Sequence, residues 1–256
     1  MPVPPVPPRT FARPCKICGS VAPWLGAVDF SKWCSAHWRA TPTIGVSVDY
    51  YRCPNCELLF TPCFDRFTPE EWKTYVYNPE YLSIDPDYAG YRGYVFASTI
   101  AETFPGAASL HVIDYGCGVG AFGNRLRELN WPLVTDYDPY VPEFSQRPIS
   151  RAHLVTAAEV LEHAHNPTDT FDEMASLRTD DGVIVASTVL SPARADASLL
   201  EWWYVAPRNG HVTIHSAKSL TLLASRANLR VASAPEGNIF FFFRRRPPWA
   251  VHALPE

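Results

Sequence analysis

The sequence predicts an α/β protein: a parallel sheet covered by helices, preceded by a small cysteine-rich module. Three features lead to this prediction. From residue 106 onward, apolar runs alternate with segments of helical periodicity, which is typical of parallel sheets. A stretch with three glycines at alternate positions, VIDYGCGVGAFG at residues 112–123, joins one such run to a helical segment. Two Cys-x-x-Cys pairs lie nearer the N-terminus.

The expected elements follow one another in order along the C-terminal part of the chain. Strands are predicted at residues 110–115, 132–136, 153–158, 182–189, 229–234 and 238–244. Helices are predicted at residues 120–130, 168–178, 193–204 and 216–227. Gly182 follows Thr-Asp-Asp, and this combination predicts a turn just before a strand.

Composition divides the chain into four segments. We expect residues 1–13 to be a disordered, Pro-rich tail. The stretch MPVPPVPPRT is polyproline-like and contains no continuous apolar run. Residues 14–66 hold every cysteine except Cys117 and form the predicted zinc-binding module. Residues 67–105 are rich in Tyr and acids and are expected to form linker helices, and residues 106–256 form the sheet domain.

Charge and hydropathy exclude some classes of function. The net charge is −4, with 22 basic and 26 acidic residues, and no basic stripe of the kind that tracks phosphates. Nucleic acid is therefore an unfavoured partner, and a small-molecule substrate is expected. No run reaches the roughly 18 apolar residues that span a bilayer. Cysteines without an export signal point to the reducing cytoplasm. Oligomeric state is not predicted.

Four cysteines have the spacing of a structural zinc site. Cys15 and Cys18 form one pair, and Cys53 and Cys56 form the other. Each Cys-x-x-Cys turn directs two sulfurs toward one point, and Zn²⁺ takes four thiolates in a tetrahedron. Redox dithiols are the alternative, but two Cys-x-x-Cys pairs in one cytosolic chain favour a zinc site over them. Four protein ligands close the site, so the zinc is expected to be structural.

The glycine-rich loop is positioned to bind a nucleotide-like cofactor. Gly116, Gly118 and Ala121 also satisfy the dinucleotide pattern G-x-G-x-x-A. Asp114, two residues before the first glycine, decides between ligands, because its carboxylate would repel a pyrophosphate. It would attract the ammonium and sulfonium groups of S-adenosylmethionine instead.

The run VIDYGCGVGAF resembles the first motif of class I S-adenosylmethionine-dependent methyltransferases. LVTAAEVLEHAHNP at residues 154–167 and LRTDDGVIVASTVL at residues 177–190 resemble later segments of that family, in the same order. With its cysteine module, the chain is similar to zinc-containing sugar C-methyltransferases. The resemblance implies a Rossmann-like class I methyltransferase sheet plus a small zinc module with four cysteine ligands.

The resemblance also implies which residues bind S-adenosylmethionine. Asp114 and the loop of Gly116, Cys117, Gly118 and Gly120 would hold its methionine part. Asp138 would bind the ribose hydroxyls, with Asp136 as the competing choice, and Glu159 would line the cofactor site. Only fifteen residues separate Asp138 from Leu154, too few for the usual helix, third strand and helix. A shortened or missing third strand is therefore expected, with adenine covered by Phe144, by residues 157–160 or by the N-terminal module.

The residues that bind the methyl acceptor are expected after the fifth strand, in EWWYVAPRNGHVTIHSAKSL at residues 201–220. His211 best matches the base of the sugar C-methyltransferases, and His163 is the second choice. The expected substrate contacts are Arg208, Asn209, Tyr204 and Tyr77. Arg208 could pair with the phosphate of a nucleotide-sugar. The expected function is methylation of a small polar acceptor, a sugar or a nucleotide-sugar. An RNA methyltransferase and a non-catalytic binding protein of the same fold are the alternatives.

Overall fold

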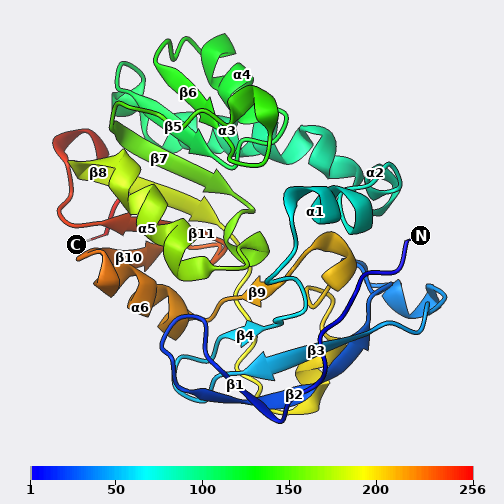
Figure 1. The fold of residues 1–256 in the computed structure, drawn as a ribbon. Coiled ribbons are helices and arrows are strands. Elements are labelled where there is room, and N and C mark those ends of the chain that lie inside the picture. The colour runs from blue at the N-terminus through cyan, green and yellow to red at the C-terminus, as the bar shows by residue number, and fades with distance from the viewer. Residues whose placement is uncertain (1, 256) are drawn as a thin grey trace. The chain divides into compact units, whose positions relative to one another are not determined.

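A computed structural model describes residues 2–255, and the chain forms two compact units (Figure 1). The first unit contains the chain up to Pro86 together with Leu161–Thr168 and Val189–Leu222. The second unit contains Asp87–Val160, Asp169–Thr188 and the chain from Leu223 onward. The first unit therefore combines the cysteine-rich part of the chain with two segments that follow sheet strands in the sequence.

The second unit contains a six-stranded sheet with the order β10-β11-β8-β7-β5-β6. Its strands are β5 (Val112–Tyr115), β6 (Val134–Tyr137), β7 (Ala152–Ala158), β8 (Arg178–Ser187), β10 (Arg230–Ser233) and β11 (Ile239–Phe243). Strands β6, β5, β7 and β8 run parallel, and β11 is antiparallel to both β8 and β10. This arrangement confirms the predicted parallel sheet with a terminal pair of strands.

Strand β6 lies at the edge of this sheet. Between Tyr137 and Ala152 the described chain contains no strand, only the 3₁₀ helix Pro142–Phe144. A backbone hydrogen bond of 3.0 Å from Asp138 N to Phe144 O closes this turn. The predicted loss of the third strand is confirmed, since the chain returns directly from the edge to β7.

Six α-helices and eight 3₁₀ helices accompany the strands in the described part of the chain. The α-helices are α1 (Pro69–Tyr75), α2 (Tyr81–Ile84), α3 (Tyr91–Thr103), α4 (Ala121–Glu128), α5 (Pro167–Leu177) and α6 (Ala217–Arg226). The 3₁₀ helices are Trp38–Ala40, Pro86–Ala89, Pro105–Ala107, Pro142–Phe144, Leu161–His163, Ala197–Glu201, Pro207–Asn209 and Pro248–Ala250. Apolar side chains of α3 and α4, Phe96 and Phe122 among them, enter the core of the second unit beside β5, β7, β8 and β11.

Two local predictions were wrong. The helix expected at residues 193–204 is only the 3₁₀ helix Ala197–Glu201, because the Asp196 side chain accepts from Ser198 N at its start and Trp202 is extended at its end. Gly182 does not form a turn before a strand but lies inside β8. A Cβ there would come within 3.0 Å of Ala152 O, at an irregularity in the β7–β8 pairing. A glycine in a strand often marks such a close approach of two backbones.

The first unit contains a five-stranded antiparallel sheet with the order β1-β2-β3-β4-β9. Its strands are β1 (Ala12–Pro14), β2 (Val21–Asp29), β3 (Ser47–Arg52), β4 (Leu59–Phe60) and β9 (Thr213–Ile214). Strand β9 comes from the segment after β8, and it pairs with β4 through Leu59 and Phe60. The sequence did not predict the pairing of this strand with β4.

The beginning of the chain contacts the same sheet. Arg9, in the segment expected to be a tail, donates to the Asp49 carboxylate at 2.8 Å and lies over the Trp24 ring. The Tyr51 hydroxyl donates to Thr10 O, also at 2.8 Å. These contacts lead directly into β1.

Helix α1 has a complete N-terminal capping box. The Thr68 side chain accepts from Glu71 N, and the Glu71 side chain accepts from Thr68 N, with Pro69 at the first helical position. Such a box satisfies two backbone donors that the helix itself leaves unpaired. The helix buries Trp72, which stacks on Phe64 in the core of the first unit at a ring distance of 5.5 Å.

Candidate functional site

Cys15, Cys18, Cys53 and Cys56 come together in the first unit. Their sulfurs all lie within 4.8 Å of one another, and the pairs Cys15–Cys56 and Cys18–Cys53 are each 3.4 Å apart. Each Cys-x-x-Cys motif starts a tight turn between two strands. Cys15 and Cys18 lie between β1 and β2, and Cys53 and Cys56 lie between β3 and β4. Four thiolates at about 2.3 Å from one Zn²⁺ have sulfurs about 3.8 Å apart. The residues therefore fit a tetrahedral metal ion.

The protonation of these thiols is interdependent. A hydrogen bond from Cys56 lowers the pKa of Cys15 to about 5, and the same hydrogen bond raises the pKa of Cys56. Burial raises the pKa of Cys53. Without a cation, one thiolate can form only at the expense of its neighbour, whereas a divalent ion would stabilise all four.

In the second unit, the glycine loop lies between β5 and α4. Gly116, Gly118 and Gly120 have φ values of 71°, 54° and 74°, a region that favours glycine. A Cβ at Gly116 would lie 2.6 Å from a Val160 methyl, and one at Gly120 would lie 3.3 Å from the Phe144 ring. At Gly118 a Cβ would meet no atom within 4 Å. The middle of the loop is therefore open to a ligand, while its two ends are packed.

The carboxyl groups of three residues determine the electrostatics of this loop: Asp114, Asp136 and Asp138. Asp114 is buried and accepts from the Thr156 hydroxyl at 2.9 Å. Burial raises the pKa of Asp114 well above its usual range, and the charges of Asp136 and Asp138 raise it further. Burial also raises the pKa of the Cys117 thiol, which disfavours its thiolate form. Such a concentration of carboxyl groups favours a cationic ligand.

Asp138 rather than Asp136 faces the glycine loop. Its carboxylate accepts from Gly118 N at 3.1 Å and from Tyr140 N at 2.9 Å, and burial raises its pKa. Asp136 points instead to α4, where it pairs with Arg127 at 2.5 Å and where a side chain on Gly123 would overlap it. Of the two candidates, Asp138 is therefore the one that lies beside the glycine loop.

Glu159 directly follows β7 in a strained conformation. Its φ is 52°, which is uncommon for a residue other than glycine. Its backbone N and its Oε1 both bond to the Ser187 hydroxyl, each at 3.0 Å. Strained residues of this kind gather at functional sites, and the two hydrogen bonds hold the carboxylate at the end of the strand.

The first unit brings Glu162, His163 and His211 together, and we name them the Glu–His–His cluster. One ligand atom from each lies within 4.8 Å of the others. The two imidazole rings meet edge to face with centroids 5.0 Å apart. Glu162 is completely buried and His211 is 5% exposed. The two histidines predicted to promote catalysis are therefore neighbours.

Two predicted substrate residues hold this cluster in place. The Tyr204 hydroxyl donates to Glu162 Oε1 at 2.6 Å, and the Tyr204 carbonyl lies 2.9 Å from His211 Nδ1. A carbonyl only accepts, so Nδ1 of His211 carries the hydrogen, and in the neutral ring the lone pair is on Nε2. The Tyr77 hydroxyl lies 3.2 Å from His163 Nδ1.

The side chains of Arg208 and Asn209 are buried and form hydrogen bonds with other parts of the first unit. Arg208 is 1% exposed, and its guanidinium donates to Val76 O at 2.6 Å and to the Asn78 side chain at 3.0 Å. The Asn209 side chain accepts from Cys34 N at 2.8 Å. In this conformation both residues hold the loop that carries His211, and neither presents its polar atoms to solvent.

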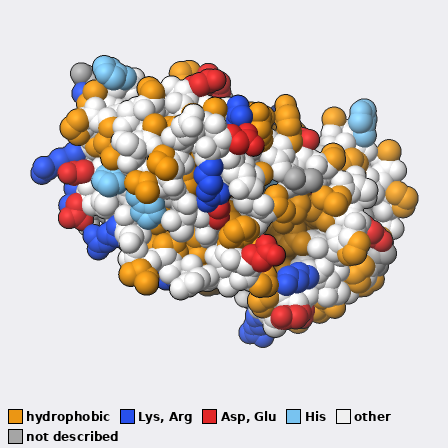
Figure 2. Space-filling model, turned by 90° about the horizontal axis from the view of Figure 1, so that it is seen from above, with side chains coloured by type: hydrophobic (Ala, Val, Ile, Leu, Met, Phe, Trp, Pro, Cys, Tyr) orange, Lys and Arg blue, Asp and Glu red, His pale blue; other side chains and the backbone are white. Residues whose placement is uncertain are grey.

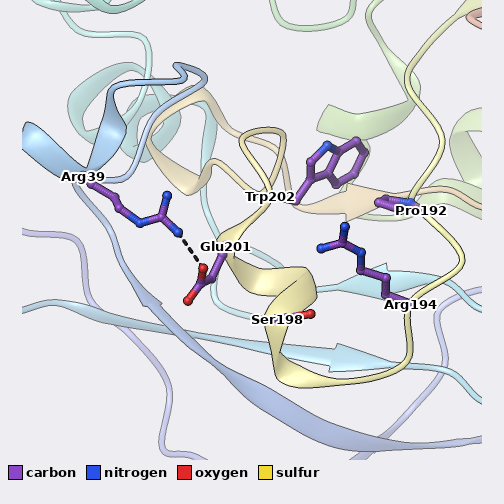
Figure 3. A pocket seen from close by; sticks show the side chains of 6 residues that line it. All are labelled: Arg39, Pro192, Arg194, Ser198, Glu201 and Trp202. Carbon is purple, nitrogen blue, oxygen red and sulfur yellow. Dashed lines mark hydrogen bonds and ion pairs between the residues drawn. The ribbon is translucent and has the colours of Figure 1, made fainter.

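A hollow of about 400 Å³ also opens in the first unit (Figure 3). It is lined by Arg39, Pro192, Arg194, Ser198, Glu201 and Trp202. Arg39 and Glu201 form an ion pair of 2.5 Å at one side, and the Arg194 guanidinium and the Trp202 indole point toward the same space. A flat ring beside a cation suits a ligand with both a ring and an anionic group.

A family model described as a methyltransferase domain matches residues 88–234, more than half of the chain. The chain belongs to this family. The matched range includes the glycine loop, Asp138, Glu159 and the Glu–His–His cluster, whereas the four cysteines lie before it. The second unit is accordingly the Rossmann-like sheet of a class I S-adenosylmethionine-dependent methyltransferase domain. No protein with a curated description matches the sequence.

Solved structures of methyltransferases are similar to this chain, and one of them has a TM-score above 0.5. An O-methyltransferase family protein from Burkholderia thailandensis superposes with a TM-score of 0.52 at 14% identity, and the match covers 70% of this chain and 63% of that protein. Magnesium protoporphyrin IX methyltransferase from Synechocystis PCC 6803, with bound SAH, gives 0.45 at 15% identity over 62% and 84%. A sugar N-methyltransferase from Streptoalloteichus sp ATCC 53650 gives 0.45 at 14% identity over 66% and 93%.

The cofactor of the methyltransferase domain is S-adenosylmethionine, and the glycine loop fits it. The opening at Gly118, the nearby Asp138 side chain and the concentration of carboxyl groups suit a cationic ligand with a ribose. Among the described residues, no helix is long and apolar enough to cross a membrane.

Sequence reasoning missed Glu162 and Cys34. Glu162 precedes His163 directly, and a carboxyl group beside a histidine just after a strand was a usable signal. Cys34 offered none: its sulfur lies 3.5 Å from His211 Nδ1, but the two residues are far apart in the chain.

Proposed function

We propose that this protein transfers the methyl group of S-adenosylmethionine to a small polar acceptor, a sugar or a nucleotide-linked sugar. The observation that carries the proposal is the Glu–His–His cluster, whose three residues lie within the range matched by the family model. Tyr77 and Tyr204 hold this cluster by hydrogen bonds. His163 follows Glu159 by four residues in the sequence.

Bound S-adenosylmethionine supplies an electrophilic methyl group on a positively charged sulfur. Residues of this chain have the remaining tasks. Asp114, Asp138 and the loop of Gly116 to Gly120 bind and orient the cofactor. A hydroxyl or enolisable acceptor must also lose a proton, and His163 and His211 promote that loss. Tyr204 orients His211 by fixing the hydrogen on Nδ1.

The hollow supports an acceptor that carries a nucleotide. Arg194 can bind a phosphate, and Trp202 can stack on a sugar or a base. The Trp202 ring lies 5.4 Å from the Tyr204 ring, which in turn lies 4.2 Å from the His211 ring. Packed aromatic rings therefore connect the wall of the hollow to His211 of the cluster.

RNA is a less suitable acceptor. On the face shown in Figure 2, Lys and Arg side chains are dispersed among Asp and Glu and do not form a stripe. Together with the net charge of −4, this arrangement supports a small molecule.

The four cysteines bind a structural zinc ion in this proposal. Both Cys-x-x-Cys turns belong to the sheet of the first unit, so one ion would join β1–β2 to β3–β4. None of the seven cysteines is in a disulfide, which agrees with the reducing cytoplasm that we propose as the location of the protein.

The test is a transfer assay with methyl-labelled S-adenosylmethionine, a panel of nucleotide-sugars and a structured RNA. We expect label in a nucleotide-sugar. His211→Ala should lower kcat by about 100-fold or more while the affinity for the cofactor, measured by calorimetry, is unchanged. His37→Ala, an exposed histidine of the same unit, is the control and should keep full activity. Label in the RNA alone, or full activity of His211→Ala, would contradict the proposal.

A further inference from the structure

The Glu–His–His cluster has the composition of a metal site as well as that of a proton acceptor. One carboxylate and two imidazoles are a common ligand set for divalent transition metals, as in zinc enzymes with two histidines and a glutamate. The ligand atoms lie within 4.8 Å of one another. Around one ion they would be about 3–3.5 Å apart, a difference that side-chain rotation can provide.

The surroundings of the cluster resemble the second layer of a metal site. Metal-binding histidines usually bond through the other ring nitrogen to a carbonyl or a hydroxyl, which fixes the ring. His211 has this contact with the Tyr204 carbonyl, and His163 has it with the Tyr77 hydroxyl. The Tyr204 hydroxyl bonds to the Glu162 carboxylate as well. Each of the three ligands is therefore oriented by a tyrosine.

Two further features favour an ion here. The Glu162 carboxyl group is completely buried, and the attraction between a carboxylate and a cation is stronger in such a water-poor interior than in bulk water. Gly210, with φ 86°, packs so closely on His163 that a Cβ would lie 3.1 Å from Nδ1. The loop thus holds the His163 ring tightly, as a site with fixed geometry needs.

We propose that Glu162, His163 and His211 bind a divalent transition-metal ion, separate from the ion at the four cysteines. Three protein ligands leave positions for oxygen atoms of the acceptor. Such an ion lowers the pKa of a bound hydroxyl, which then loses its proton to solvent. This role rests on the proposed function and specifies how the two histidines promote deprotonation. The proposal of the ion itself does not depend on the acceptor.

The test uses full-length protein whose cysteine site has first been filled with one equivalent of Zn²⁺. Mn²⁺ is then titrated, with calorimetry and the electron paramagnetic resonance signal of free Mn²⁺ as readouts, and a second Zn²⁺ is titrated in parallel. We expect one further ion per chain. His163→Asn and Glu162→Gln should weaken its binding by more than about 100-fold, and Tyr204→Phe by about 10- to 100-fold. His37→Ala should bind like wild type.

Because Glu162 is buried, Glu162→Gln could fail to fold, whereas His163 is only partly buried and keeps the test valid. A zinc content of one equivalent and an unchanged melting curve show that a variant is folded. If wild type binds no second ion, or if His37→Ala and His163→Asn weaken binding equally, the metal proposal is wrong. Loss of activity in His211→Ala would then still support direct proton transfer. A bound second ion without methyl transfer would overturn the proposed function alone.

Discussion

Gly118 offers a direct test of the cofactor loop, because its surroundings separate folding from binding. Its φ is 54°, yet a Cβ would meet no protein atom within 4 Å. Gly118→Ala therefore adds a methyl group that only the backbone conformation and a bound ligand can sense. No side chain of the described protein has to move.

The expected sizes of the two effects follow from this geometry. The left-handed conformation costs a residue with a Cβ about 1–2 kcal/mol, which corresponds to a fall in Tm of roughly 2–8 °C. A methyl group in the space that we propose for the cofactor should cost about 1–3 kcal/mol of binding free energy, comparable to overpacking a core. The Kd for S-adenosylmethionine should therefore rise roughly 5- to 150-fold.

Gly237 provides the matched control. It lies in the same unit, between β10 and β11, with φ 76° and no atom within 4 Å of an added Cβ. Gly237→Ala should lower Tm as Gly118→Ala does and leave the Kd unchanged. Thermal melts and calorimetric titration with S-adenosylmethionine measure both quantities. Wild-type affinity in Gly118→Ala, or an equal loss in Gly237→Ala, would refute the placement of the cofactor on this loop.

Two further predictions concern the first unit. Removing zinc with a chelator should abolish the protection of β1–β4 amides from hydrogen exchange, and Cys15→Ser should do so without chelator; unchanged protection would argue against a structural ion. His215 is buried, and burial lowers its pKa from 6.5 to about 4. Between these pH values His215 is protonated in the unfolded chain but neutral in the folded chain. The free energy of unfolding should therefore fall as pH drops from about 6.5 to 4. His215→Asn should flatten this dependence in urea titrations, and an identical slope in both proteins would exclude His215 as its source.

The sheet of the second unit was predictable because its signals are local. Buried parallel strands are short apolar runs such as Val112–Tyr115, and each is followed by turn residues and a helical pattern. The missing third strand was a matter of length, since fifteen residues cannot hold two helices and a strand. The two errors, at Gly182 and at residues 193–204, are places where a local signal was outweighed by backbone contact with β7 or by packing of Leu199 and Leu200 into the first unit.

The cysteine pairs and the glycine loop were also predictable from the sequence, because the geometry of each depends on only a few neighbouring residues. Each Cys-x-x-Cys turn presents two sulfurs on its own, and the alternating glycines are needed for the positive φ values of one turn. Asp114 indicated the charge of the ligand, although only the structure revealed that it is buried against Thr156.

The sequence by itself determined the class of sheet, the cofactor loop and the four cysteines, since these depend on spacings of a few residues. Only the tertiary structure decided which distant residues share a site. It brought Glu162 and His163 to His211, added β9 to the sheet of the cysteine module, and turned Arg208 inward. The physical reason is that such contacts depend on burial and hydrogen bonding throughout the unit. A local pattern of residues does not contain this information.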